Sequence, residues 1–93
     1  MSLDINSPLI ILGGGPQQRK VYEISQSLNI KTLCVDKNKN CIGASIADYY
    51  LNVSVKNSQK IIRKLEETKL NFSGVILVMS EFIKTGFFFS LLL

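Results

Sequence analysis

The 93-residue chain contains no histidine and no tryptophan, and it has only two cysteines, Cys34 and Cys41. Without histidine, Ser-His-Asp and Cys-His active sites cannot form, and nearly every zinc site loses its usual nitrogen ligand. Cys34 lies in an apolar run and Cys41 in a polar loop, without CxxC spacing, so we expect reduced thiols in a cytoplasmic protein. These absences argue against a self-contained enzyme and against a bound metal.

Long runs of one charge are also missing. Eleven Lys and Arg against seven Asp and Glu give a net charge of +4. The basic residues are spread along the chain, with short pairs at Arg19-Lys20 and Arg63-Lys64, and no base-stacking aromatics alternate with them, so a dedicated nucleic-acid surface is not expected. The N-terminus does not resemble a secretion signal. The apolar C-terminal run is too short for a membrane-spanning helix, which needs about 20 residues, so no membrane partner is expected either.

Short apolar runs, typical of strands, recur along the chain at residues 9–12, 32–36, 49–55 and 74–79. Between the first two, helical spacing predicts a helix of about three turns that begins after Pro16 and ends near Asn29. Its expected apolar face consists of Val21, Ile24, Ser25 and Leu28. Residues 42–47 predict a short helix or turn. A further helix, capped by Asn57 or Ser58, follows the third strand, with an apolar stripe of Ile61, Ile62 and Leu65.

This alternation of strands and helices predicts a parallel sheet with right-handed crossovers. We expect a three-layer α/β fold, equivalent to half of a Rossmann fold, with about four strands in the order 3-2-1-4. Ligands of such sheets bind at the carboxyl ends of the strands. Three segments should therefore converge: the loop at residues 13–18, Asp36, and Ser80-Glu81.

The most informative local feature is the turn Gly13-Gly14-Gly15-Pro16. Glycines let backbone N–H groups approach a ligand, and the following helix presents its positive end to an anion. Gly13 and Gly15 fit the dinucleotide motif G-x-G-x-x-G, but Gln18 occupies the third glycine position, which argues against bound NAD. A tight turn without a ligand stays an alternative. Asp36 stands where an acid would hold a ribose, or it caps the turn at residues 37–40.

The apolar tail at residues 82–93 follows an expected domain at residues 1–81. Its strongly apolar end is either a further element packed on the sheet or an aberrant end left by truncation. We favour truncation, because a half-finished fold precedes it. A third interpretation makes the chain an interaction module that docks through this tail.

Four segments together resemble a known family. They read Leu9-Ile-Ile-Leu-Gly-Gly-Gly-Pro, Leu33-Cys-Val-Asp, Ala47-Asp-Tyr-Tyr-Leu-Asn-Val and Gly74-Val-Ile-Leu-Val-Met-Ser-Glu. This succession resembles the pre-ATP-grasp domain, the N-terminal domain of ATP-grasp ligases such as the carbamoyl-phosphate synthase large subunit, biotin carboxylase and the purine-pathway carboxylases. The resemblance covers roughly residues 8–81.

The resemblance implies a full-length relative that uses ATP and Mg²⁺ to join a carboxylate to an amine or thiol through an acylphosphate. This domain would bind the carboxylate or acceptor substrate through Gly13, Gly14, Gly15, Pro16 and Gln17, with Asp36 and Glu81 nearby. The family's ATP-binding lysines, magnesium ligands and catalytic arginine lie in later domains, and nothing in this chain matches them. We therefore expect no catalytic residue, metal or cofactor here, no activity of the chain alone, and the missing ATP-grasp domain as its partner. A homodimer is compatible with the sequence.

A second resemblance competes with the first. The run Gly13-Gly-Gly-Pro-Gln-Gln-Arg-Lys followed by a helix and Leu33-Cys-Val-Asp is similar to the NAD-binding domain of siroheme synthase, a precorrin-2 dehydrogenase. That resemblance implies an oxidoreductase domain. The region around Ala47-Asp48 and the Ser-Glu ending fit this family less well.

Overall fold

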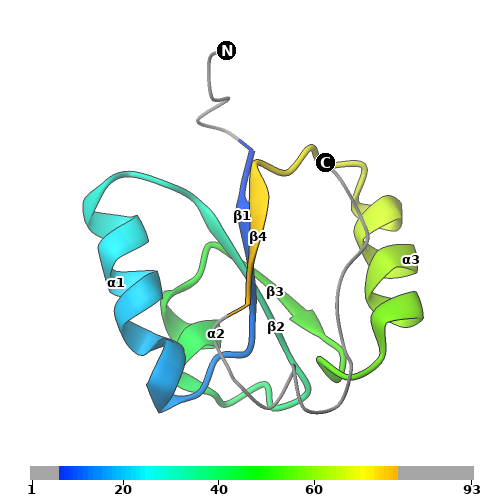
Figure 1. The fold of residues 1–93 in the computed structure, drawn as a ribbon, viewed down its shortest axis with the longest axis horizontal. Coiled ribbons are helices and arrows are strands. Elements are labelled where there is room, and N and C mark those ends of the chain that lie inside the picture. The colour runs from blue at the N-terminus through cyan, green and yellow to red at the C-terminus, as the bar shows by residue number, and fades with distance from the viewer. Residues whose placement is uncertain (1–6, 78–93) are drawn as a thin grey trace.

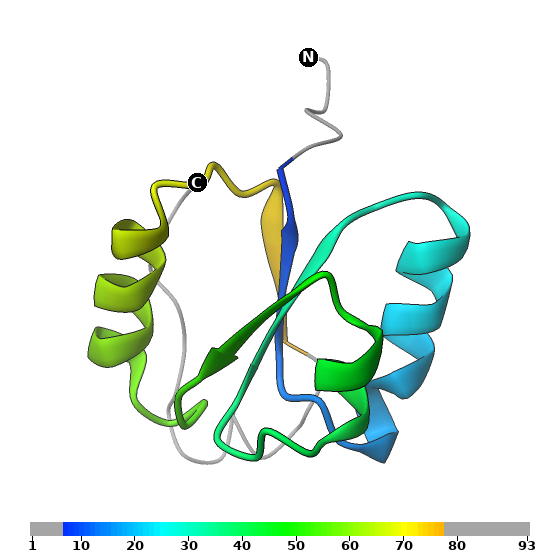
Figure 2. The same cartoon turned by 180° about the vertical axis from the view of Figure 1, so that it is seen from behind.

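A four-stranded parallel sheet lies between two layers of helix (Figure 1) in the computed structural model, which describes residues 7–77. The elements in chain order are β1 (Leu9–Leu12), the 3-10 turn η1 (Pro16–Gln18), α1 (Arg19–Ser27), β2 (Thr32–Asp36), α2 (Ile42–Ile46), β3 (Tyr49–Asn52), α3 (Ser58–Thr68) and β4 (Gly74–Leu77). The strand order β3-β2-β1-β4 confirms the predicted α/β fold and its 3-2-1-4 topology. Helices α1 and α2 cover one face of the sheet, and α3 covers the other (Figures 1 and 2).

The register of the sheet brings the strand ends to one edge. Leu12 of β1 pairs with Val35 of β2 and with Leu77 of β4, while Asp36 pairs with Asn52 of β3. Because all four strands are parallel, the segments that leave their carboxyl ends begin side by side. The glycine turn after β1 and the acid that ends β2 are therefore neighbours in space.

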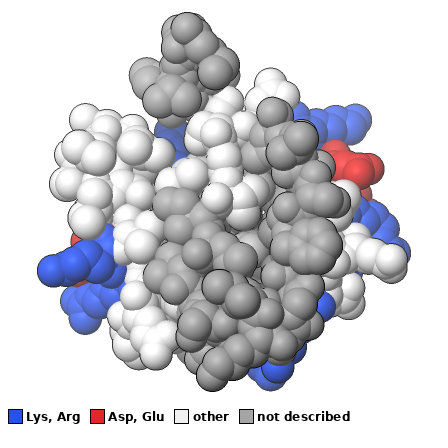
Figure 3. Space-filling model, in the orientation of Figure 1, with Lys and Arg blue, Asp and Glu red and all other residues white. Residues whose placement is uncertain are grey.

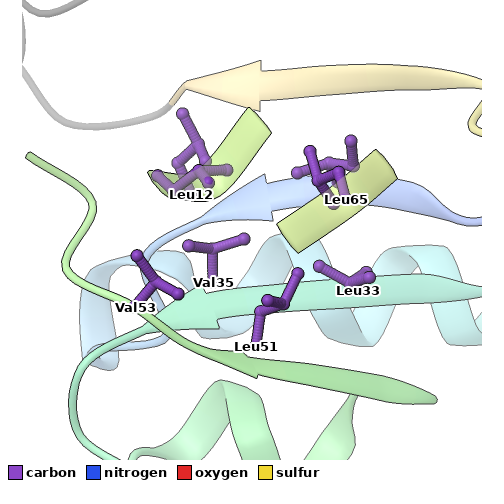
Figure 4. Close-up of a cluster of buried hydrophobic side chains, with 8 residues drawn as sticks. Leu12, Leu33, Val35, Leu51, Val53 and Leu65 are labelled. Carbon is purple, nitrogen blue, oxygen red and sulfur yellow. The ribbon is translucent and has the colours of Figure 1, made fainter. Parts of the chain in front are cut away.

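Apolar residues fill the space between the sheet and α3. This cluster consists of Ile10, Leu12, Leu33, Val35, Leu51, Val53, Ile61 and Leu65, most of which Figure 4 shows as labelled sticks. Successive residues of β1 point to opposite faces, so Ile11 is buried on the other side of the sheet. Burial of both faces explains why the central strands β1 and β2 are nearly continuous apolar runs rather than alternating ones.

The layer between the sheet and the pair α1–α2 is more polar. Its buried cluster contains Ile11, Tyr22, Cys34 and Cys41. Two polar residues of the η1–α1 segment, Gln18 and Ser25, are also buried. Buried polar atoms need hydrogen-bond partners, so the side chains on this side of the sheet must be matched to one another more specifically than those on the α3 side.

The predicted apolar face of α1 is only partly correct: Ser25 is buried and Val21 is half-buried, but its two other residues face solvent. Ile24 and Leu28 are 53% and 63% exposed, whereas Tyr22 is fully buried. The helix is rotated so that the Tyr22 ring packs against Gly43 of α2, where a Cβ would lie only 2.7 Å from the ring. The tyrosine hydroxyl also donates to the carbonyl oxygen of Gly13 at 2.7 Å. A specific aromatic contact and hydrogen bond thus replace the contact predicted from apolar periodicity.

Most other element predictions agree with the structure. The Asn57 side chain caps α3 by accepting the Lys60 N–H at 3.1 Å. In that helix Ile61 and Leu65 are buried, and Ile62 is half-buried. The segment at residues 42–46 is a short helix, as one of the two alternatives held.

Strand β3 is shorter than predicted, because it ends at Asn52 rather than at residue 55. The N–H of Val53 donates to the Leu51 carbonyl at 3.0 Å, which turns the chain out of the ladder while Val53 stays buried. The predicted strand end at residues 78–79, the Ser80-Glu81 segment and the tail at residues 82–93 lie outside the described residues. Within residues 7–77, no helix has the length and apolar character needed to cross a bilayer.

Candidate ligand-binding site

Gly13 begins the turn that follows β1, and its backbone has φ of +100°. Residues that carry a side chain rarely adopt this backbone conformation, so the turn itself requires the first glycine. Its N–H donates to the Val35 carbonyl at 2.8 Å, and its own carbonyl accepts the Tyr22 hydroxyl. The start of the turn is therefore fixed to both β2 and α1.

Gly14 is required by close packing. A Cβ on this residue would lie 2.6 Å from Sγ of Cys41 and 2.8 Å from Sγ of Cys34, which is closer than any normal contact. Its carbonyl accepts the Gly43 N–H at 2.8 Å, so the turn also rests directly on α2. The two glycines together explain the tight turn without reference to a ligand.

Asp36 connects this turn to the end of β2. Its Oδ2 accepts the Gly14 N–H at 2.9 Å, and its Oδ1 accepts the Asn38 N–H at 2.8 Å. The second bond is the predicted capping of the turn at residues 37–40. The first was not predicted, and it removes the Gly14 amide from the set of donors that could face an anion. Each carboxylate oxygen keeps a further lone pair for another donor.

A pocket of about 380 Å³ opens at this edge of the sheet. Its lining consists of Gly13, Gly15, Pro16, Gln17, Gln18, Asp36 and Val55. Five of the predicted site residues are therefore brought together. Gly14 contributes to the site only through its bond to Asp36, and Glu81 lies outside the described residues.

Sequence reasoning missed Gln18 and Val55 as pocket residues. Gln18 is only 1% exposed, and its terminal amide lies under the turn. A Cβ at Gly13 would be 3.4 Å from Oε1 of Gln18, and one at Gly15 would be 3.3 Å from the same atom. The sequence did contain a signal for Gln18. This residue occupies the third glycine position of the motif, so its side chain must fill the space that a glycine would leave empty.

The amide nitrogen of Gln18 is buried and has no hydrogen-bond partner among residues 7–77. Leaving a buried amide donor unpaired costs about 1–3 kcal/mol. Buried polar groups in folded proteins nearly always have a partner, so such an atom beside a pocket calls for an explanation.

The Cys34 thiol beneath the turn is not an activated nucleophile. Both cysteines are free and buried, and their sulfur atoms lie 3.9 Å apart. Burial raises the pKa of Cys34 to about 12, and the pKa of Tyr22 is also raised, chiefly by burial. The reactive form of a cysteine is the thiolate, so Cys34 is unreactive at neutral pH. Among the described residues, no three His, Cys, Asp or Glu side chains gather as metal ligands.

Charged side chains are spread over the described part of the molecular surface. On the face shown in Figure 3, the visible Lys and Arg side chains lie toward the rim, in separate groups. Arg19, at the start of α1, forms an exposed ion pair with Glu23 at 3.0 Å. The charge that lines the pocket itself belongs to Asp36, so within the described residues the pocket has an acceptor side and no cationic side chain.

Comparison with models of known protein families and with curated proteins gave no match to this chain.

Proposed function

We propose that this chain is a substrate-binding domain of the pre-ATP-grasp type, belonging to an ATP-dependent ligase that joins a carboxylate to an amine or thiol. One observation carries the proposal: the pocket at the carboxyl edge of the sheet joins the glycine turn, Asp36 and the amide of Gln18. These groups can hold a small polar molecule. Among the described residues of the pocket, the Asp36 carboxylate is the one possible base, and no nucleophile or metal ligand set accompanies it.

One feature of the proposed site favours a small substrate over a dinucleotide. In the dinucleotide fold the third glycine permits close contact between helix and strand. Here that position is the buried side chain of Gln18.

The resemblance assigns ATP and Mg²⁺ to an ATP-grasp domain, which is the proposed partner, and not to the residues of this pocket. The proposed reaction therefore requires that domain. The free thiols of Cys34 and Cys41 support the proposal of a reducing, cytoplasmic location.

Calorimetric titration with 2-hydroxybutyrate and with Mg-ATP tests this proposal. We expect saturable, weak binding of the carboxylate and no binding of Mg-ATP. Tight binding of Mg-ATP by this chain alone would contradict it, because the nucleotide site would then lie within these 93 residues.

The NAD-binding domain of an oxidoreductase is the second candidate, and one observation favours it: Asp36 lines the same pocket as the glycine turn. NADH fluorescence separates the two candidates. A saturable signal that is lost in Asp36→Ala would replace the first proposal with the second, whereas no response at millimolar NADH supports the first.

A further inference from the structure

We propose that Gln18 is a ligand-binding residue that selects the ligand of this pocket: its amide nitrogen donates to a carboxylate oxygen placed against the glycine turn, while Asp36 accepts a hydrogen bond from a hydroxyl or ammonium group on the same molecule. This inference rests on the function proposed above and specifies its ligand as a small carboxylic acid with a neighbouring hydrogen-bond donor.

The first argument is the buried amide itself. Gln18 is 99% removed from solvent by the fold, it lines the pocket, and its Nε2 has no partner among residues 7–77. An apolar side chain of the same length would fill this space without an unpaired donor. A glutamine is useful there when a ligand supplies the missing acceptor.

The second argument is the start of helix α1, which contributes to the same pocket. Gly15 is the N-cap of the 3-10 turn η1 and Pro16 is its first residue, and both line the cavity. Helix N-termini attract negative charge, and α1 with its 3-10 extension runs from Pro16 to Ser27. An acceptor atom that reaches Nε2 of Gln18 thus lies where a carboxylate is favoured.

The third argument is the chemistry of Asp36. Its two oxygens accept the N–H groups of Gly14 and Asn38, so the carboxylate is held rigidly and retains acceptor capacity. A ligand with negative charge alone would be repelled by this carboxylate. A hydroxyl or ammonium group beside the ligand carboxylate removes that conflict, because it donates to Asp36.

Three probes of the same carbon skeleton test the ligand class: butyrate, 2-hydroxybutyrate and 2-aminobutyrate. We expect the hydroxy acid or the amino acid to bind at least about tenfold more tightly than butyrate, the gain typical of a hydrogen bond to a charged group. The stronger of the two identifies the donor as hydroxyl or ammonium. Equal binding of all three, or binding of none, would overturn the proposed ligand class.

The variant Gln18→Met tests the residue, because it keeps the length of the side chain and removes the donor. We expect at least about a tenfold loss of affinity for the better probe, with an unchanged or higher urea midpoint, since no unpaired amide stays buried. A purely structural role for Gln18 predicts the reverse, a lower midpoint with unchanged affinity. Gln26→Met, an exposed site later in α1, is the matched control and should change neither quantity.

A second variant, Gln18→Glu, keeps the test valid if the methionine variant does not fold. At pH 7 the introduced carboxylate repels the probe and binding is lost; near pH 5 part of it returns as that carboxyl takes up a proton and can donate. Binding of the probes to wild type with no effect of either Gln18 variant would refute the role of Gln18 and leave the proposed function standing. Failure of every carboxylate together with saturable NADH binding would refute both.

Discussion

Gly14 is the residue at which the turn, β2 and α2 meet. Its N–H donates to Asp36, its carbonyl accepts the Gly43 N–H, and a Cβ at this position would overlap the sulfur atoms of Cys34 and Cys41. A triple glycine is usually explained by the needs of a ligand. Here the backbone conformation requires Gly13 and the packing beneath the turn requires Gly14, whereas Gly15 has an ordinary φ of −75° and faces the pocket.

We therefore expect Gly14→Ala to lower the free energy of unfolding by about 1–3 kcal/mol, the usual result of overfilling a packed interior. Urea denaturation measures this change. Gly15→Ala is the matched control and should cost less, since its Cβ would meet only the Gln18 amide at 3.3 Å. Adding Cys41→Ala to Gly14→Ala should recover part of the lost unfolding free energy. If the double variant is no more stable than Gly14→Ala alone, the contact with the Cys41 sulfur is not the cause of the loss.

The Cys34 thiol makes stability depend on pH. Burial raises its pKa from 9.0 to about 12, so the folded state keeps the proton while the unfolded chain releases it above pH 9. Stability is then fully present below pH 9 and falls as the pH rises toward 12. Tyr22, whose pKa is raised by burial, acts in the same direction.

Urea midpoints measured between pH 8 and 11 check this expectation. The unfolding free energy should fall with pH, and Cys34→Ala should reduce the slope by up to about 1.4 kcal/mol per pH unit, the value for one proton. If the unfolding free energy of Cys34→Ala fell with pH as steeply as that of the wild type, this would contradict a buried, protonated thiol at Cys34.

At the scale of elements, α1 shows where sequence periodicity fails. Its exposed side contains Ile24 and Leu28, and its buried side contains Tyr22 and Ser25. Apolar spacing alone could not reveal that the ring of Tyr22 fits against Gly43 and that its hydroxyl reaches Gly13, because both contacts depend on residues distant in the sequence.

Substitutions on the two sides of α1 should therefore differ strongly. Ile24→Gln and Leu28→Gln should each change the unfolding free energy by no more than about 0.5 kcal/mol, as expected for exposed positions. Tyr22→Ala should cost about 3–5 kcal/mol, typical of a buried aromatic residue. Thermal or urea denaturation of the three variants tests this difference. A large loss of unfolding free energy in Leu28→Gln would show that the predicted apolar face is buried after all.

The fold was predictable because its signals are local. Four short apolar runs alternate with segments of helical periodicity, and this alternation predicts a parallel sheet. Asn57 marks the start of α3, because its side chain caps the helix by accepting an N–H three residues later. The site was predictable only in part. Strand ends place the turn beside Asp36, but the bond from Gly14 to Asp36 and the burial of Gln18 arise from tertiary contacts that no local pattern encodes.

At the scale of the whole molecule, the two faces of the sheet have different roles. The α3 side is an apolar cluster that stabilises the sheet. The α1–α2 side contains the sulfur atoms, Tyr22 and Gln18, and it supports the glycine turn from below. The pocket at the carboxyl edge takes most of its lining from the glycine turn and η1, so polar substitutions in those two segments can tune it without changing the main apolar core.

Amide chemical shifts of the ¹⁵N-labelled protein during titration with 2-hydroxybutyrate and 2-aminobutyrate test the central claim most directly. The pocket account predicts saturable shifts at Gly13, Gly15, Gln18, Asp36 and Val55, with the ends of α3 unaffected. Shifts centred on the start of α3, around Ser58, or no shifts in the turn at saturating probe, would contradict it.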